Sequence, residues 1–169
     1  MTDASEEIDE GLPPGEIVSE LSGRKAKVAS AAYGDPKVLI IAADTIVEHR
    51  GKIIGKPEGE SDARDTLALL SGDFHRVYSG ITVAFDDKSI CGFDVTTVKF
   101  RDIGQGEIDK YIKTGDPFLK AGSYGVQGPG AALVERIEGD FFNVVGLPVA
   151  KFAEILKDGF GLTIFDLII

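Results

Sequence analysis

The sequence predicts an α/β domain, and three observations carry that prediction. Segments with helical spacing of apolar residues alternate with short runs rich in valine, isoleucine and threonine, as they do in α/β proteins. Residues 37–43 (KVLIIAA) form a continuous apolar run, which is typical of a strand covered on both faces in a mixed or parallel sheet. No internal repeat, low-complexity linker or long charge run divides the 169 residues, so a single domain over residues 1–169 is expected.

The first helix is predicted over residues 16–32. A proline pair precedes this segment, apolar residues recur in it at helical spacing, and Gly34 provides a stop. The strand of residues 37–43 comes next, and Asp44 ends its apolar run.

A second helix is predicted over residues 61–70, because Ser61 is a favourable capping residue and a Ser-Gly pair follows the apolar pattern. Three segments rich in β-branched and aromatic residues come after it, over residues 77–85, 89–95 and 96–101. An Asp-Asp turn separates the first two of them. This order of strands and turn predicts a β-meander.

The last third of the chain predicts shorter elements. We expect a helix over residues 107–113, a strand over 131–137, and a helix over 148–156 with proline in its first turn. Residues 143–148 (NVVGLP) are almost wholly apolar, so a short buried strand that turns into the last helix is expected there.

The C-terminal residues 162–169 (LTIFDLII) are strongly apolar. They predict a final strand packed on the core, and an exposed tail that contacts a partner is the alternative. The run is far shorter than the ~20 apolar residues that cross a bilayer, and the acidic N-terminus has no signal-peptide pattern. We therefore expect a cytoplasmic protein that does not associate with membranes.

The charge balance excludes one class of partner. The chain has 18 lysine and arginine residues against 28 aspartate and glutamate residues, which gives a formal net charge of −10 at pH 7. Nucleic-acid binding requires a basic face, so no nucleic-acid partner is expected. Cys91 is the single cysteine and cannot form an intrachain disulfide, which fits a reducing compartment.

Two polar residues in the first half of the chain are candidates for chemistry. Asp44 follows the predicted buried strand, and ligands of open α/β sheets bind beyond the carboxyl ends of strands. An aspartate that only bonds to local backbone is the alternative at this position. Lys56 lies in a Gly-Lys-Pro turn, where its ammonium could neutralise an anionic ligand.

Residues 120–130 (KAGSYGVQGPG) carry four glycines. Such a segment indicates tight turns or a close approach of the backbone to a ligand, and a flexible surface loop is the alternative. Gln127 lies among these glycines. Its amide offers both a donor and an acceptor, so it could read the edge of a nucleobase.

The metal-binding chemistry that the sequence allows is that of a hard cation. His49 and His75 are far apart and match no zinc pattern, so both are expected to be solvated or hydrogen-bonded. A magnesium ion is held by carboxylates and substrate phosphates without such a motif. Asp9, Glu10 and Asp44 are the candidate ligands, although the acidic start of the chain could equally be a solvated segment.

Several short motifs occur in one order along residues 8–156. They are IDE (8–10), RKA (24–26), ADTIV (43–47), GKP (55–57), LSGDFHRVYSG (70–80), VKFR (98–101), GDPFLKAG (115–122), KAGSYGVQG (120–128) and NVVGLP (143–148). With this set the chain resembles the Maf family of nucleoside triphosphate pyrophosphatases. The resemblance implies an elongated mixed sheet with flanking helices and a central cleft.

The resemblance also implies an activity: hydrolysis of a nucleoside triphosphate to the monophosphate and pyrophosphate with Mg²⁺ or Mn²⁺. By similarity, Asp44 would accept a proton from the attacking water and would hold the metal together with Glu10. Lys25 and Lys56 would contact the triphosphate and offset charge on the leaving pyrophosphate. Lys120 is also expected to bind the substrate.

Base choice is implied by two further positions. Members of the family differ at the residue after the catalytic aspartate and at the glutamine of the VQG motif. Thr45 and Gln127 stand there in this chain, and this combination resembles the branch that acts on dTTP and UTP. A hydroxyl and an amide could read the oxygen and N–H groups of a pyrimidine.

The chain departs from the family pattern at its start. Family members begin with an apolar strand and an S-x-S-P-R-R segment, and Met1 stands where they are already ~25 residues along, about a strand and most of a helix. A truncated domain that lacks the first strand and the paired arginines is therefore expected. The alternative function is that of a catalytically impaired form that acts as a nucleotide-binding or regulatory module. A weaker alternative is a pyrophosphatase specific for deaminated purines, of the inosine triphosphate pyrophosphatase group. The sequence is compatible with a homodimer.

Overall fold

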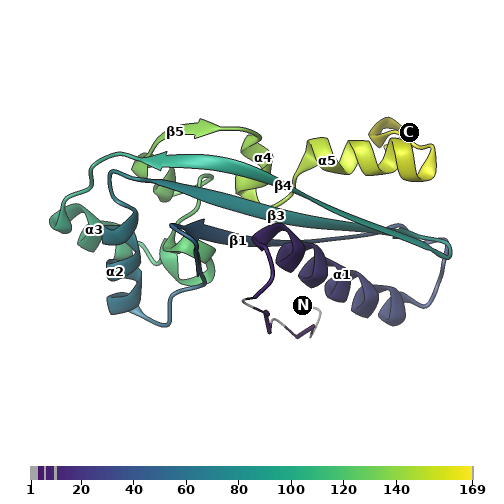
Figure 1. Cartoon of the computed structure of the whole chain (residues 1–169), viewed down its shortest axis with the longest axis horizontal. Helices are drawn as coiled ribbons and strands as arrows, with labels where there is room; N and C mark the ends of the chain where they lie inside the picture. Colours follow the sequence, from purple (N-terminus) through teal and green to yellow (C-terminus); the bar gives the residue numbers. More distant parts are fainter. Residues whose placement is uncertain (1–3, 6, 10, 169) are drawn as a thin grey trace.

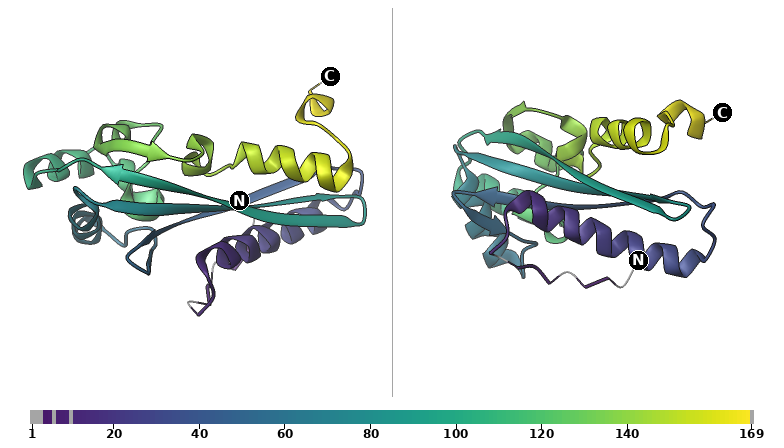
Figure 2. Two further views of the ribbon diagram at one scale, coloured as in Figure 1. Left: turned by 45° about the horizontal axis from the view of Figure 1, so that its top comes forward. Right: turned by 45° about the vertical axis from the view of Figure 1, so that its right-hand side comes forward.

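The computed structural model describes residues 4, 5, 7–9 and 11–168. A five-stranded sheet in the order β2-β1-β3-β4-β5 runs through the elongated molecule (Figure 1). Helix α1 covers one face of the sheet, and α4 and α5 lie on the other (Figure 2). Helices α2 and α3 pack at one end of the sheet. The predicted α/β class and the flanking helices are confirmed.

Helix α1 spans Pro14–Tyr33 and confirms the predicted first helix. Proline is favourable in its first turn because the amide hydrogen that proline lacks has no partner there. Gly34 ends the helix in a left-handed conformation, with its N–H bonded to the Ser30 carbonyl, as glycine does at many helix ends. The buried face of α1 carries Ile17, Val18 and Leu21.

Strand β1 spans Ile40–His49, so the predicted end of the strand at Asp44 is wrong. Asp44 lies inside β1, opposite Gly80 of the neighbouring strand. The residues that follow Asp44 are mostly β-branched and favour extended backbone. One half-buried carboxylate does not end the strand, since it is directed to one side of a pleated ribbon.

All strand pairs that the described residues form are antiparallel, whereas a mixed or parallel sheet was expected. The short strand β2 (Lys52–Ile54) forms a hairpin with β1. The connection that follows stays at that end of the sheet, so β3 (Phe74–Phe85) starts opposite the end of β1, with Glu48 paired to Arg76. A strand that begins beside the end of its neighbour can only run antiparallel to it.

Helix α2 spans Glu60–Leu70 and confirms the second predicted helix and its end. Its N-cap residue is Gly59, so Ser61 lies inside the first turn and the predicted serine cap is wrong. Strand β4 (Lys88–Phe100) is one strand, where the sequence suggested two. Its backbone stays extended through Val95 and Thr96, and its pairing with β3 is continuous. The predicted turn between β3 and β4 is confirmed.

The last elements are short. Helix α3 (Gln105–Ile112), strand β5 (Val134–Glu138) and helix α5 (Val149–Glu154) confirm their predictions, and a π-helical turn extends α5 through Ile155–Phe160. Between α3 and β5 lie three 3₁₀ segments, Asp116–Leu119, Ala121–Ser123 and Pro129–Leu133.

The NVVGLP segment is not a strand. It belongs to helix α4 (Phe141–Val145) and to the turn that follows. The Asp140 side chain caps this helix by accepting a hydrogen bond from the Phe142 N–H at 2.8 Å, and Gly146 ends it in a positive-φ conformation. A cap and a glycine stop thus determine the conformation of a segment whose apolar composition alone indicated a strand.

The predicted C-terminal strand is also wrong within the described residues. Ile164–Leu167 form a 3₁₀ turn, and Thr163 and Asp166 close a capping box around it. Such side-chain bonds to local backbone compete with extended structure. Phe165 and Ile168 are 69% and 73% exposed, as the exposed-tail alternative expects, whereas Leu162 and Ile164 pack against the core cluster around Leu156. No helix in the described part of the chain is long and apolar enough to span a membrane.

Candidate functional site

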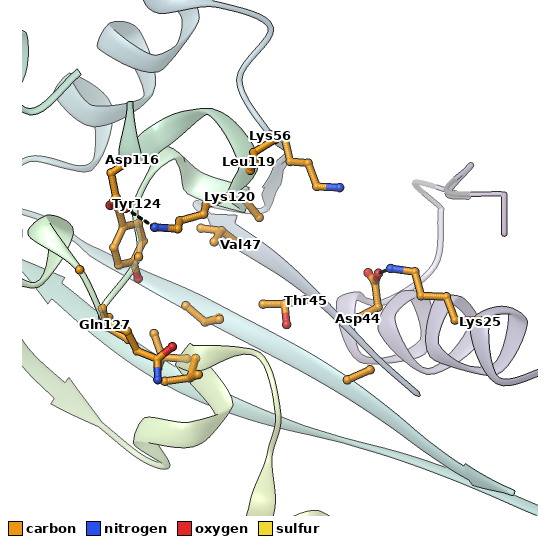
Figure 3. Close-up of a pocket in the computed structure, with 18 residues that line it drawn as sticks. Lys25, Asp44, Thr45, Val47, Lys56, Asp116, Leu119, Lys120, Tyr124 and Gln127 are labelled. Carbon is orange, nitrogen blue, oxygen red and sulfur yellow. Dashed lines mark hydrogen bonds and ion pairs between the residues drawn. The ribbon is translucent and has the colours of Figure 1, made fainter. Parts of the chain in front are cut away.

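A cavity of about 540 Å³ opens beside the middle of β1. Its walls come from β1, the adjoining part of α1, the turn after β2, the first two 3₁₀ segments with the loop that follows them, and α4 (Figure 3). Six residues that the sequence singled out line this one cavity: Lys25, Asp44, Thr45, Lys56, Lys120 and Gln127.

Strand β1 directs its consecutive residues Asp44 and Thr45 to opposite faces of the sheet. On the far side from β3, β1 is paired with β2 only at Val47–His49. Within the described residues, the part of β1 that carries Asp44 and Thr45 is therefore an edge of the sheet. A cavity at this edge can be reached by side chains from both faces.

Asp44 lies on the face covered by α1 and forms an ion pair with Lys25. The two side chains are 12% and 23% exposed, so the pair is largely shielded but reachable from the cavity. Helix α1 holds Lys25 in place through its buried apolar face. The Asp44 side chain contacts this lysine across the fold, which differs from the alternative of an aspartate that bonds only to its own turn.

Lys56 reaches the same cavity from the turn after β2 (Figure 3). The structure therefore brings together, in one cavity, a carboxylate and ammonium groups from separate parts of the chain. Such a set suits a polyanionic ligand, because cations gathered in a cleft neutralise several phosphate charges at once.

Lys120 is positioned by Asp116, a residue that the sequence analysis missed. The Asp116 carboxylate contacts the Lys120 ammonium and accepts a 2.6 Å hydrogen bond from the Tyr111 hydroxyl. Burial favours a raised pKa for Asp116, but the hydrogen bonds from Lys120 and Tyr111 outweigh it and the pKa is lowered. The signal was present in the sequence as an Asp-Lys pair with i,i+4 spacing in GDPFLKAG.

The glycine-rich segment of residues 120–130 is built into the cavity wall. Gly122 has φ of +70°, and a β-carbon there would lie 2.9 Å from a Val47 methyl. A β-carbon on Gly125 would lie 2.6 Å from the Lys120 Nζ. The expected tight turn is therefore confirmed at Gly122, and the backbone of this segment lies close to side chains of the chain itself. A close approach to a ligand stays a prediction. Gln127 stands exposed at the cavity edge.

Both histidines are buried and hydrogen-bonded, as one of the two expectations for them stated. His49 contacts the Asp73 carboxylate at 3.0 Å. His75 Nε2 lies 2.7 Å from the hydroxyl of Tyr124, which lines the cavity. Burial lowers the pKa of His75 to about 4, and the neighbouring His49 adds to the effect. His75 is therefore neutral near pH 7 and supports Tyr124 from behind.

The described residues contain no cluster of three or more histidine, cysteine, aspartate or glutamate side chains around a common point. Glu10, a predicted metal ligand, lies outside the described residues, and Asp9 accepts a hydrogen bond from the Gly11 N–H. Magnesium is commonly held by one or two carboxylates together with substrate phosphates. Asp44, which borders the cavity beside the lysines, fits that kind of shared site.

Comparison with known proteins agrees with the motifs. The chain matches the family described as Maf-like protein over residues 1–159. It is 46% identical over 160 residues to a dTTP/UTP pyrophosphatase of Bacillus pumilus (strain SAFR-032), and this alignment covers 95% of this chain and 83% of the relative. It is 42% identical over 163 residues to a dTTP/UTP pyrophosphatase of Clostridioides difficile (strain 630), and this alignment covers 94% of this chain and 84% of the relative. The chain therefore belongs to the Maf-like family.

Proposed function

We propose that this chain hydrolyses dTTP and UTP to the nucleoside monophosphate and pyrophosphate. The observation that carries the proposal is the cavity beside β1, where Asp44, Lys25, Lys56 and Lys120 converge with Gln127. The relatives reported above are named dTTP/UTP pyrophosphatases, and this chain is 46% identical to one of them over 160 residues.

In the proposed reaction, Asp44 accepts a proton from a water molecule that attacks the α-phosphorus. A bond forms between the water oxygen and that phosphorus, and the bond from the α-phosphorus to the oxygen bridging to the β-phosphate breaks. A general base must lie within hydrogen-bond reach of the water. Asp44 suits this role because its carboxylate borders the cavity and is held by Lys25.

The lysines act on the phosphates. Negative charge builds on the departing pyrophosphate, and ammonium groups in a partly enclosed cavity stabilise it more strongly than they would in bulk water. Lys56 and Lys120 approach from a different wall from Lys25 (Figure 3), so they can contact phosphate oxygens on the other side of the chain of phosphates. Asp116 keeps the Lys120 ammonium in position.

A divalent cation, Mg²⁺ or Mn²⁺, belongs to the proposal. When bound, it would neutralise phosphate charge and polarise the α-phosphoryl group. Asp44 is the described residue that would hold it, and Glu10 is proposed as a second ligand. Thr45 and Gln127 are proposed to contact the base, since both line the cavity and Gln127 lies across it from the Lys25–Asp44 pair (Figure 3).

The proposal is tested by pyrophosphate release from dTTP, UTP, CTP, GTP and inosine triphosphate with Mg²⁺ or Mn²⁺. We expect release from dTTP and UTP, and a loss of at least about 100-fold in kcat for Asp44→Asn, the range that removal of a general base produces. The matched control is Asp87→Asn, which changes an exposed carboxylate in the β3–β4 turn. Nucleotide binding without pyrophosphate release, or full activity of Asp44→Asn, would contradict the proposal.

A further inference from the structure

A buried serine lies behind Thr45. Ser79 is opposite Thr45 in the pairing of β3 with β1, and it is wholly buried. Its Oγ lies 2.8 Å from the Thr45 Oγ1 and 2.7 Å from the backbone carbonyl oxygen of Asn143 in α4. The single serine hydroxyl therefore links the cavity wall to helix α4.

The donors in this chain of contacts can be assigned. A carbonyl oxygen only accepts, so Ser79 must donate its one hydroxyl hydrogen to Asn143. Ser79 can then only accept from Thr45, because two hydroxyl oxygens at 2.8 Å need a hydrogen between them. The hydrogen of the Thr45 hydroxyl is thereby used. Toward the cavity, Thr45 offers lone pairs and acts as an acceptor.

Asn143 keeps this direction fixed. The side-chain amide nitrogen of Asn143 donates to the Val77 carbonyl at 2.9 Å and to the Thr96 hydroxyl at 3.0 Å. The Thr96 hydroxyl donates in turn to the Asp140 backbone carbonyl. The backbone carbonyl of Asn143 also accepts a 3.1 Å hydrogen bond from the Gly146 N–H, and Asn143 is wholly buried. If the Ser79 hydroxyl turned toward Thr45, the Asn143 carbonyl would face an oxygen lone pair at 2.7 Å, and that arrangement is unfavourable in a buried site.

We propose that Ser79 determines base specificity by holding the Thr45 hydroxyl as an acceptor for the N3–H group of uracil or thymine. The inference rests on the proposed function. On their hydrogen-bonding edge, uracil and thymine carry one donor, N3–H, between two carbonyls, whereas cytosine presents an unprotonated N3. An acceptor facing that atom attracts the first two bases and repels the third. The Gln127 amide can donate to an adjacent carbonyl of the base.

Modified nucleotides test this assignment on the unaltered protein. In 3-methyl-UTP a methyl group replaces the N3 hydrogen, whereas 5-methyl-UTP keeps that hydrogen and gains a methyl of the same size. We expect kcat/KM for 3-methyl-UTP to be at least about 10-fold below that for 5-methyl-UTP, as sites that bond a substrate N–H reject analogues without it. Equal kcat/KM for the two would overturn the proposal.

The Ser79→Ala variant tests the residue itself. Without the serine oxygen, the Thr45 hydrogen is released and can turn to the N3 atom of cytosine, so the ratio of kcat/KM for UTP to that for CTP should fall by about 10-fold or more. The matched control is Ser22→Ala, which breaks a buried 2.8 Å serine–threonine contact between α1 and β3, outside the cavity. A ratio that changes equally in both variants, or in neither, would overturn the proposal.

A variant of Thr45 separates hydrogen bonding from bulk. Thr45→Val keeps the size of the side chain and removes the acceptor, so kcat/KM for UTP should fall while kcat/KM for CTP, which loses a repulsive contact, does not fall. A ratio of kcat/KM for UTP to that for CTP that Thr45→Val leaves unchanged would show that bulk sets the preference and would overturn the proposal. If the protein releases pyrophosphate from no nucleotide, the proposed reaction fails. The same comparison of variants is then made with dissociation constants for UTP and CTP from titration calorimetry, and a preference for UTP that Ser79→Ala removes would still support the inference.

Discussion

Replacing Asn143 with alanine should destabilise the protein because its side chain joins α4 to the central strands. The amide nitrogen donates two buried hydrogen bonds, to the Val77 carbonyl and to the Thr96 hydroxyl. Each contributes about 1 kcal/mol, and a buried carbonyl left without its donor adds a desolvation cost of about 1–3 kcal/mol. The amide oxygen of Asn143 has no partner among the described residues, so its removal offsets part of the loss.

The net loss in the free energy of unfolding is therefore expected to be about 2–3 kcal/mol. Urea unfolding measures it, and with a slope of about 2 kcal/mol per molar the midpoint should fall by about 1 M. Ser89→Ala is the control, since this exposed residue in the β-hairpin should change stability by less than about 0.5 kcal/mol. A loss below about 1 kcal/mol for Asn143→Ala would refute the claim that this amide anchors α4.

Three further predictions concern the cavity and its support. Lys25→Met should lower kcat/KM for UTP by about 10-fold to 100-fold, because one cation is lost from the reacting end; an unchanged value would contradict its role. Gly125→Ala should raise KM for UTP several-fold, because the new β-carbon would lie 2.6 Å from the Lys120 Nζ and must displace that ammonium group. Gly106→Ala is the control: its new β-carbon meets no atom within 4 Å, so KM should stay unchanged. His75 has a pKa lowered to about 4 by burial, so the unfolded chain binds more protons and stability falls as the pH drops from 6.5 to 4, by on the order of 3 kcal/mol. Urea unfolding of His75→Phe should show a weaker pH dependence in that window, and an equal one would contradict the assignment.

The helices were the part of the fold that the sequence predicted best. The helix α1 was predictable because a proline pair, helical spacing and Gly34 are all local signals. Strand direction was less accessible. The apolar run around Ile40 looks the same in a parallel and an antiparallel sheet, and the pairing of Glu48 with Arg76 depends on where the chain returns after α2.

The segments around Asn143 and Thr163 show a second limit. Both are apolar and were expected as strands, but single polar side chains determine their conformations. Asp140 caps α4, and Asp166 closes the turn near the C-terminus. A short capped helix and a short buried strand have similar composition, so the outcome depends on hydrogen bonds that periodicity does not show.

The candidate site was predicted residue by residue from motifs, and the structure places six of those residues around one cavity, whereas Glu10 lies outside the described residues. What the sequence did not show is the layer behind them. Asp116 holds Lys120, His75 supports Tyr124, and Ser79 contacts Thr45. Each of these pairs, except the i,i+4 pair of Asp116 and Lys120, joins residues far apart in the chain, so their partners emerge only when the strands are in register.

The central claim is that this cavity directs water to the α-phosphorus of a nucleoside triphosphate. The most direct test is hydrolysis of UTP in water enriched in the heavy isotope of oxygen, followed by mass spectrometry of both products. We expect the heavy oxygen to enter the nucleoside monophosphate and pyrophosphate to stay unlabelled. Label in pyrophosphate would place the attack at the β-phosphorus, and release of inorganic phosphate in place of pyrophosphate would show that the bond between the β- and γ-phosphates is the one that breaks. Either result would contradict attack at the α-phosphorus.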